Sequence, residues 1–482
     1  MSSLHSTRSG GQTARSLAVA ALLLIALMVT PSALLAHAHL EKSEPSSGAR
    51  ITSTLTAVRL WFSEAPELAF TTITLLGPDS GHVSIGEVQH IPGEPLAVTV
   101  AIRSALAAGE YTVAWQTAAA DGHPSRGRFS FEVQPSPTAQ GQMSERRAEG
   151  TPHSMSGPAS EALDTESPAY VAVRWLSFAA LLTLIGVVAF RVLVVPGAGR
   201  LADTHARQAT SGPITEQMSS RAAVVGVGAA AALLVAHTLR LYAQLVAMQG
   251  RGSVDVAMMR QMVAQTHWGM AWLLEAVGSI VALLVFVLAV RTSSRGTRAA
   301  RVAWAVATAA VLLLAFTPAL GGHAAAVPRL TTLAIAADGL HILGAGGWLG
   351  ALLIVLTVGV PVALAAAPPD RGALVADLVN AFSPTALVFA SVVVLTGVFT
   401  AWLHLGSLAA FWGSGYGRTL LLKLGILIPV LGTGAYNWRR VRPALGDVAA
   451  ANRLRRSAFA ELAIGGLVIL VTAILVGMQT PK

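Results

Sequence analysis

Long apolar runs dominate the chain from residue 169 onward. Each run has about the 20 residues that a helix needs to cross the roughly 30 Å hydrocarbon core of a bilayer. Within residues 169–482 the pattern therefore predicts an α-helical transmembrane bundle of eight helices. The runs are 169–193, 222–248, 267–290, 302–320, 331–358, 383–405, 419–438 and 457–478.

Residues 37–133 show a different pattern. Short segments alternate apolar and polar residues or run apolar for the length of one strand, and turn-forming stretches such as GPDSGH, IPGEP and AADGHPSRG separate them. We predict a small antiparallel β sandwich. The expected fold class is therefore multidomain, with an all-β sandwich followed by the membrane bundle. The predicted strands contain TAVRLWFS, AFTTITLL, EPLAVTVAI, EYTVAWQT and GRFSFEV.

The segment 1–36 has the anatomy of a cleaved signal peptide. Two arginines precede the apolar run Leu17–Val29, which at 13 residues is too short to span a membrane, and small residues follow up to Ala36. Cleavage after Ala36 or after Ala38 would leave a histidine as the first residue of the mature protein.

A linker is predicted between the sandwich and the bundle. Residues 134–168 are rich in Pro, Ser, Gly, Thr and Glu and show no apolar periodicity. Such a composition does not bury enough apolar surface to fold, so we expect a flexible tether.

Composition supports a membrane protein. Of 482 residues, 54% are hydrophobic and 12% are charged, and the mean hydropathy is +0.61. These values exclude an ordinary soluble protein. The net charge of +9 does not indicate a nucleic-acid partner, because in membrane proteins Lys and Arg in loops report orientation.

The basic residues lie mostly on one side of the predicted bundle. If the sandwich is outside, one set of loops is cytoplasmic, and the opposite loops and the tail hold few basic residues, which agrees with the positive-inside rule. We therefore expect a multi-pass protein of the cytoplasmic (inner) membrane with a periplasmic or extracellular N-terminal domain. The cytoplasmic set is Arg200, Arg207, Arg291, Arg295, Arg298, Arg301, Arg371, Arg439, Arg440, Arg442, Arg453, Arg455 and Arg456, against Arg251, Arg260, Arg329, Arg418 and Lys482.

The chain contains no cysteine. Disulfides, zinc–thiolate sites, iron–sulfur clusters and cysteine nucleophiles are thus excluded. The available metal ligands are His, Met, Asp and Glu.

Histidines gather in the outer half of the predicted bundle. Asp338 precedes His341 by three residues and so shares its helix face. A carboxylate within a span is costly, so Asp338 is predicted either to bind a metal or to orient a ligand, with an interhelical hydrogen bond as the alternative. The five outer histidines are His237, His267, His323, His341 and His404.

Methionines form a second group on the same side. Met258 and Met262 are one helical turn apart, with Met259 adjacent, and thioethers are ligands that select Cu(I). An amphipathic helix on the membrane surface is the alternative explanation. Glu275 is another carboxylate within a span, which either binds a cation, relays a proton or pairs with Arg240 or another helix.

The sequence also suggests a metal site on the outer domain. Asp121 and His123 are separated by one residue, so on an extended segment both point to the same side. With the amine and imidazole of a terminal His37, the set has three nitrogens and one carboxylate oxygen, which suits a tetragonal Cu(II).

These segments resemble known families. HAHLEKSEPSSG, VRLWFSE and GEYTVAWQTAAADGHPSRGRFSFEV resemble a CopC-type periplasmic copper-binding domain. HILGAGGWLGALL, HLGSLAAFWGSGYGRTLLLKLGILIPVLGTGAYNWRR and RRSAFAELAIGGLVILVTAILV resemble CopD, the copper-resistance membrane protein. Together they resemble CopC–CopD fusions.

The resemblance implies a Greek-key, Ig-like sandwich with a Cu(II) site formed by His37, Asp121 and His123. It also implies a role in moving copper inward, and hence in copper homeostasis. Because residues 37–133 hold no methionine, the Met-rich Cu(I) loop of some CopC domains is absent. Expected partners are copper ions, the lipid bilayer and copper chaperones of the periplasm or cytoplasm.

Three other functions stay open at this stage, and we expect no enzyme. Paired histidines such as His237 and His341 on facing helices would suit a haem-binding electron carrier. A terminal-histidine copper centre is able in principle to activate oxygen, although Asp121 would occupy the position that an oxidase keeps open. A copper sensor or buffer that does not transport is the third. No Walker motif suggests coupling to ATP.

Overall fold

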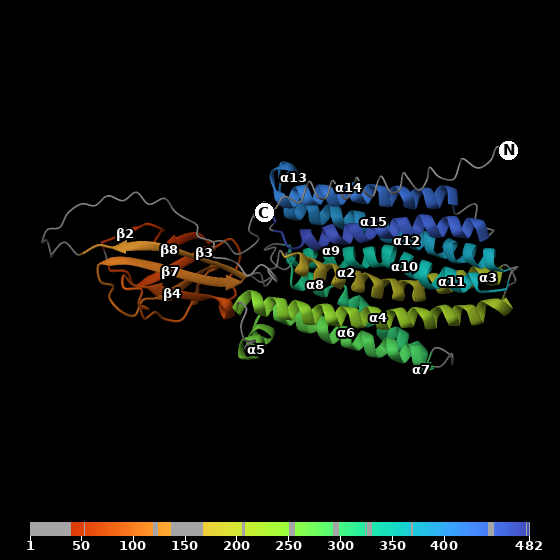
Figure 1. Ribbon diagram of the computed structural model, residues 1–482, viewed down its shortest axis with the longest axis horizontal. Coiled ribbons are helices and arrows are strands. Elements are labelled where there is room, and N and C mark those ends of the chain that lie inside the picture. The colour runs from red at the N-terminus through yellow and green to blue at the C-terminus, as the bar shows by residue number, and fades with distance from the viewer. Residues whose placement is uncertain are drawn as a thin grey trace. The chain divides into compact units, whose positions relative to one another are not determined.

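The described residues form strands up to residue 133 and helices from residue 168 (Figure 1). Because the two regions are separate in architecture, each is described by itself. The computed structural model describes residues 40–52, 54–118, 124–135, 167–204, 208–249, 256–292, 298–322, 324, 330–367, 370–441, 448–478 and 480–481.

Two four-stranded sheets make up the first region, with strand orders β1-β3-β6-β5 and β2-β8-β7-β4. Only β5–β6 and β7–β8 are consecutive strands paired in one sheet, and the other connections cross between sheets, which agrees with the predicted Greek-key sandwich. The strands are β1 (Leu40–Glu44), β2 (Arg50–Ile51), β3 (Ala57–Phe62), β4 (Thr72–Leu76), β5 (Gln89–Ile91), β6 (Glu94–Ala101), β7 (Gly109–Ala118) and β8 (Pro124–Val133), with a 3₁₀ turn η1 (Leu68–Phe70).

The sandwich is not antiparallel throughout, contrary to the prediction from the sequence, because one strand pair is parallel. The two-residue strand β2 pairs with β8 in parallel, whereas every other described pair is antiparallel. The chain leaves β1 in one sheet and reaches the edge of the other sheet beside the end of β8. Because no hairpin joins β2 to β8, the direction of β2 is set by this crossing.

Alternating side chains of β3 show how the sandwich core forms. Val58, Leu60 and Phe62 are at most 1% exposed, while the intervening Arg59 is exposed. The Phe62 ring meets the Trp115 ring of the other sheet edge to face, with ring centroids 5.2 Å apart. The period of two in the sequence thus places one face of each sheet inward.

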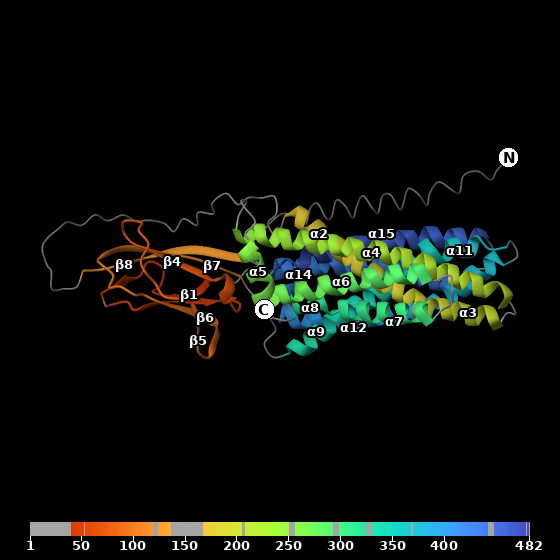
Figure 2. The same cartoon turned by 90° about the horizontal axis from the view of Figure 1, so that it is seen from below.

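Within the described residues, the second region contains eight helical segments that are long and apolar enough to cross a membrane, as predicted. Several helices extend past the apolar runs, since a helix continues into the polar layer on either side of the hydrocarbon. Figures 1 and 2 show the segments side by side along one common direction. The segments are 168–202, 212–246, 268–292, 298–320, 331–364, 371–405, 415–439 and 454–475.

The helices of the bundle, in chain order, are α2 (Pro168–Ala189), α3 (Val195–Thr204), α4 (Gln208–Gln249), α5 (Val256–Gln265), α6 (His267–Thr292), α7 (Arg298–Leu314), α8 (Thr317–Leu320), α9 (Thr331–Ala345), α10 (Ala351–Ile354), α11 (Val360–Leu364), α12 (Arg371–Leu405), α13 (Ala410–Gly413), α14 (Gly415–Tyr436) and α15 (Val448–Leu475). In the part of the bundle that the structure describes, four π-helical segments interrupt them: η2 (Phe190–Val194), η5 (Gly346–Gly350), η6 (Val355–Gly359) and η7 (Asn437–Val441).

Two spans form the centre of the bundle. The spans at 331–364 and 168–202 have 78% and 67% of their apolar window buried, against 11% for the span at 371–405. A Cβ atom at Gly186 would overlap the backbone of Gly350, and one at Gly350 would overlap the carbonyl of Leu182. Glycine at both positions therefore allows α2 and η5 to approach to backbone contact, as small residues do between membrane helices.

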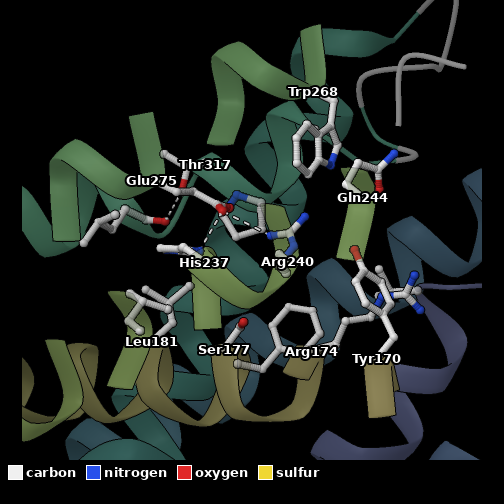
Figure 3. Close-up of a pocket in the computed structure, with 17 residues that line it drawn as sticks. Tyr170, Arg174, Ser177, Leu181, His237, Arg240, Gln244, Trp268, Glu275 and Thr317 are labelled. Atoms are coloured by element: carbon white, nitrogen blue, oxygen red, sulfur yellow. Dashed lines mark hydrogen bonds and ion pairs between the residues drawn. The ribbon is translucent and has the colours of Figure 1, made fainter. Parts of the chain in front are cut away.

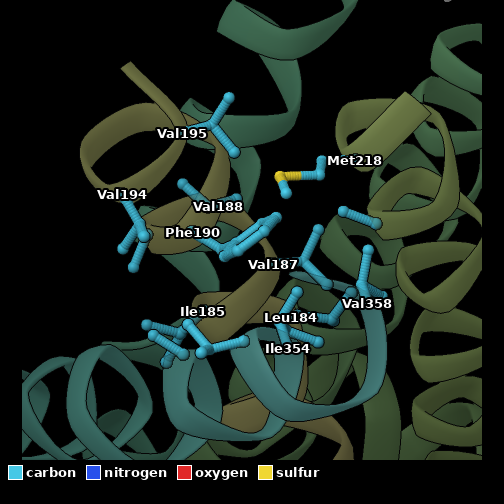
Figure 4. Packing of buried hydrophobic residues seen from close by; sticks show 14 of the residues in the cluster. Leu184, Ile185, Val187, Val188, Phe190, Val194, Val195, Met218, Ile354 and Val358 are labelled. Atoms are coloured by element: carbon cyan, nitrogen blue, oxygen red, sulfur yellow. The ribbon is translucent and has the colours of Figure 1, made fainter. Parts of the chain in front are cut away.

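Apolar side chains fill the space beside this contact. Phe190 of η2 is fully buried and lies near Val188, Val195 and Met218, so α2, α3 and α4 share one cluster (Figure 4). Ile354 and Val358 of the other central span join the same cluster. The packing fixes which faces of the two central spans turn toward each other.

Successive spans run in opposite directions, so the bundle has two ends. We call the end where α2 begins at Pro168 the linker end, and the other the far end. The first residues of α6, α9 and α14 and the last residues of α4 and α12 lie at the linker end. Most polar side chains predicted to matter for function lie toward this end.

Candidate functional site

The predicted Cu(II) ligands lie outside the described residues. These are His37, Asp121 and His123. The neighbouring strands are described: β7 ends at Ala118 and β8 begins at Pro124, and these two residues pair with each other. In the sequence, Asp121 and His123 fall between these two strands, and their role as ligands stays a prediction.

A buried polar cluster joins α4 to α6. His237 and Glu275 are 3% and 4% exposed. Nη1 of Arg240 donates to Oε2 of Glu275 at 3.1 Å, and Nδ1 of His237 lies 3.3 Å from the same oxygen. This confirms the pairing of Glu275 with Arg240, one of the alternatives that the sequence left open.

Further side chains hold this cluster in place. The indole of Trp272 donates to the backbone carbonyl of His237 at 2.9 Å. The hydroxyl groups of Tyr170 and Thr317 contact Arg240 and Glu275 respectively. The carboxylate thus has a guanidinium beside it, and this positive charge offsets much of the cost of burying the negative one.

The cluster faces a cavity of about 80 Å³ at the linker end (Figure 3). Its lining includes Tyr170, Arg174, His237, Arg240, Trp268 and Glu275. This volume holds a few water molecules. Nδ1 and Nε2 of His237 are both buried and neither has a hydrogen-bond partner among the described residues, so the ring is available to a ligand or to water.

The charges around the cavity limit what it binds. Arg174 and Arg240 contribute two positive charges and Glu275 one negative charge. Arg174 also lies over the ring of Tyr170, 4.6 Å from its centroid. A bare divalent cation is disfavoured in such a lining, so His237 alone does not make a metal site.

Asp338 and His341 have separate partners. Nδ1 of His341 lies 3.0 Å from the hydroxyl of Thr396 on α12. Asp338 interacts by charge with Lys423 on α14. The interhelical hydrogen bond, one of the alternatives for this pair, is therefore observed for His341, whereas the charge that acts on Asp338 is that of Lys423.

His404 lies at the last turn of α12. It is buried, and its Nδ1 is 3.2 Å from the hydroxyl of Tyr416 on α14. The side-chain contacts of two further histidines of the predicted copper path are not described. His323 lies outside the described residues, and for His267 only the backbone, at the start of α6, is described.

The methionines lie on α5. Met262 is fully buried beside Leu245 and Trp268, and Met258 and Met259 pack partly buried against the same cluster. The cluster against which they pack is hydrophobic. Across the part of the chain that the structure describes, no three or more His, Asp or Glu side chains come close enough together to hold a metal. Copper binding within the membrane region therefore stays a prediction.

Several charged residues within the spans are not among those predicted from the sequence, and two of them are Lys423 and Glu461. Lys423 interrupts the apolar run LLLKLG, and Glu461 interrupts AFAELAIGG. A single charged residue in a spanning helix is the signal that pointed to Asp338 and Glu275, and it would have found both. Their partners, however, come from other spans.

Family comparisons cover both regions of the chain. The CopC domain family matches residues 40–134, the family described as Copper resistance protein D-like, N-terminal domain matches 163–332, and Copper resistance protein D matches 376–475. The first match covers the sandwich, and the other two cover most of the helical bundle.

Relatives give the same assignment. Copper transport protein CutJ of Bacillus subtilis (strain 168) is 26% identical over 466 residues, which are 95% of this chain and 77% of that protein. Protein YobA of Escherichia coli (strain K12) is 34% identical over 121 residues, 25% of this chain and 97% of that protein. The crystal structure of CopC from Methylosinus trichosporium OB3b is 25% identical and covers 22% of this chain and all of that one, with a TM-score of 0.20. On the family matches and the first two relatives, the chain belongs to the family of CopC–CopD fusions, in which a CopC domain is followed by a multi-pass membrane region.

Proposed function

We propose that this protein captures Cu(II) outside the cytoplasmic membrane and passes copper inward through its helical bundle. The family supports copper as the transported ion, and direction and capture are the proposal. The observation that carries it is the placement of the described membrane histidines, all three of which lie toward the linker end.

Depth along the helices supports an entrance at this end. His404 is the second residue from the end of its span, while His237 and His341 lie nine and ten residues from theirs. At 1.5 Å per residue, the latter two are about 14–15 Å inside the span. Copper arriving at the linker end would thus meet one imidazole near the surface and two at greater depth.

Capture is assigned to the outer domain. The mature amine and imidazole of His37, with Asp121 and His123, provide the donors that Cu(II) prefers. The linker of 35 residues keeps the captured ion at high effective concentration near the bundle. Inside the bundle we propose passage as Cu(I), because imidazole and thioether ligands suit that ion, along His237, His267, His323, Asp338, His341, His404 and the methionines Met258, Met259 and Met262.

Orientation and partners follow from the same scheme. The domains are proposed as a signal peptide at 1–36, the CopC-like domain at 37–133, the linker at 134–168 and the membrane domain at 169–482. The outer domain lies on the periplasmic or extracellular side, and copper chaperones on either side of the membrane would supply and accept the ion.

Copper accumulation in cells at limiting external copper tests the proposal. We expect the intact chain to raise cytoplasmic copper, His341→Ala to abolish the rise, and His37→Ala to weaken it only at low copper. His90→Ala is the matched control, because His90 is an exposed histidine of the sandwich and should change nothing. Equal membrane levels of each variant are checked by immunoblot.

Two results would contradict import. Accumulation that is unchanged or lower on expression of the intact chain would indicate an exporter, a sensor or a buffer. A haem electron carrier is distinguished by a Soret band in the purified protein. That alternative rested on His237 and His341 facing each other, but the described partner of His237 is on α6 and that of His341 is on α12.

A further inference from the structure

A second buried carboxylate lies toward the far end of the bundle. Glu461 is on α15, seven residues into its span, which places it about 10 Å from the start of that span. The residue is only 4% exposed. Because the span begins at the far end, this carboxylate lies on the side opposite to the histidines described above.

The contacts of Glu461 are with neutral groups. Nδ2 of Asn437 donates to Oε2 of Glu461 at 3.3 Å, and the indole of Trp348 is a second donor to the carboxyl group. Within the described residues no Lys, Arg or His forms an ion pair with it. An ionised carboxylate buried in a membrane region without a counter-charge is strongly disfavoured.

Charged groups on the neighbouring elements do not compensate for this. The helical segments that pack most extensively against α15 are α2, α10, α12, α14, η6 and η7, and η5, which has no charged residue, contributes Trp348. The described charged side chains toward the far end, on these elements and on α15 itself, are Arg371, Asp377, Arg439, Arg455 and Arg456. None of them contributes to the electrostatic environment of Glu461.

The amide of Asn437 suits both protonation states of this carboxyl group. Its N–H group donates to the ionised form, and its oxygen is buried with no hydrogen-bond partner among the described residues. A protonated carboxyl group has an O–H that needs an acceptor, and the Asn437 oxygen can accept it after a rotation of the amide. The pair thus offers a donor to one form and an acceptor to the other.

The backbone at this site is also unusual. Asn437 is the first residue of the π-helical segment η7, and Trp348 is the central residue of the π-helical segment η5. π-helical turns are rare and are frequent at functional sites. Both donors to Glu461 therefore come from segments where the regular helix is interrupted.

We infer that Glu461 is a proton-exchange site in the far half of the membrane domain, which takes up and releases a proton while Asn437 follows its protonation state. The site goes beyond the proposed copper path, and its ligand is a proton rather than copper. The inference rests on the contacts of Glu461 and does not require that the copper proposal be correct.

Carbodiimide labelling tests the site on the full chain in lipid nanodiscs. Dicyclohexylcarbodiimide adds to protonated carboxyl groups in apolar surroundings, and mass spectrometry locates the adduct. We expect a label on Glu461 that decreases as the pH rises. No label on Glu461 at any pH, with the reagent shown to be active, would overturn the inference.

Infrared spectroscopy provides a second readout that does not depend on reagent access. We expect the C=O band of a protonated carboxyl group, titrating with pH, to be lost in Glu461→Gln. Glu275→Gln is the matched control, because Glu275 is equally buried but is paired with Arg240, so its removal should leave the band unchanged. A band that persists in Glu461→Gln would overturn the inference.

Copper accumulation keeps the two proposals apart. If Glu461→Gln loses the protonated-carboxyl band and the intact chain nevertheless fails to accumulate copper, the proton site stands and the import proposal fails. If the intact chain imports copper and the band is unaffected by Glu461→Gln, import stands and the proton site fails.

Discussion

Two carboxylates at opposite ends of the bundle are equally buried but have different neighbours. Glu275 and Glu461 are each 4% exposed. Glu275 has Arg240 and His237 within 3.3 Å, whereas the described contacts of Glu461 are an amide and an indole. Burial alone therefore does not decide how a membrane carboxylate behaves. The neighbouring charge does, since it determines whether the ionised form is offset.

The comparison assigns different chemistry to the two ends. At the linker end the charge of Glu275 is held by fixed partners beside a small cavity, which gives structural support to the region around His237. At the far end Glu461 has a partner that can serve either protonation state. The first arrangement resists a change of charge, and the second permits one.

The largest effect is expected from breaking the pair at the linker end. Arg240→Met leaves Glu275 buried without its guanidinium, and removal of one partner of a buried ion pair costs about 3–5 kcal/mol. Thermal unfolding in nanodiscs should show the loss. The double variant Arg240→Met with Glu275→Leu is the control, and it should recover most of the stability because no charge is left buried. No recovery would show that the pair matters through packing alone.

A smaller effect is expected at the far end. Glu461→Ala leaves the Asn437 amide and the Trp348 indole without their acceptor, and an unsatisfied buried donor costs about 1–3 kcal/mol. Glu461→Gln keeps an acceptor oxygen and adds no charge, so its unfolding temperature should stay close to that of the intact chain. Equal losses in the two variants would mean that Glu461 is needed in its ionised form.

The next smaller loss of stability is expected from removing the hydrogen bond between Trp272 and the linker-end cluster. Trp272→Phe removes the hydrogen bond from the indole to the carbonyl of His237 while keeping an aromatic ring, and we expect a loss of about 1 kcal/mol. Trp175→Phe is a matched control, since its indole donates to the carbonyl of Gly466 and should cost a similar amount without touching the cluster. Copper accumulation should decrease only in Trp272→Phe.

The smallest effect is expected for an ion pair in the sandwich. Glu44 accepts from Arg59 at 3.3 Å and lies 3.1 Å from Lys42, but all three side chains are largely solvated. Lys42 first, and then Arg59, lower the pKa of Glu44 from its ordinary value. The stabilisation is therefore present above the ordinary pKa of Glu and is lost as the pH falls through the lowered value.

Because solvent and salt screen this pair, Glu44→Gln should leave the unfolding temperature at neutral pH unchanged within error. If Glu44→Gln lowered the unfolding temperature as much as Arg240→Met does, burial would not be the reason that the Arg240–Glu275 pair stabilises the protein. Raising the salt concentration should change neither the loss of stability in Arg240→Met nor its recovery in the double variant, because the Arg240–Glu275 pair is buried.

The outlines of the molecule could be predicted from sequence because they depend on local patterns. Apolar runs of spanning length gave eight helices, and alternation gave the strands whose inward residues include Val58 and Leu60. The one parallel pair, β2 with β8, was not predictable, since two residues carry no signal of the strand beside which they lie.

The candidate sites were predicted only in part. Single charged residues within spans pointed to Asp338 and Glu275, and the Arg240 pairing was among the alternatives. Lys423 and Glu461 carried the same signal. The copper ligands His37, Asp121 and His123 depend on the family resemblance and on a terminal amine, and they lie outside the described residues.

By itself, the sequence determined which segments of this protein are apolar enough to span a membrane, which form the sandwich, and where charged residues interrupt the spans. The cost of placing a charge or a backbone group in an apolar medium is local, so it is visible in one segment at a time. Only the tertiary structure decided the partners: Glu275 with Arg240, His341 with Thr396, and Glu461 with Asn437 and Trp348. These partners are on different helices, and which faces of the helices meet depends on side-chain packing across the whole bundle, including the glycine contact between α2 and η5.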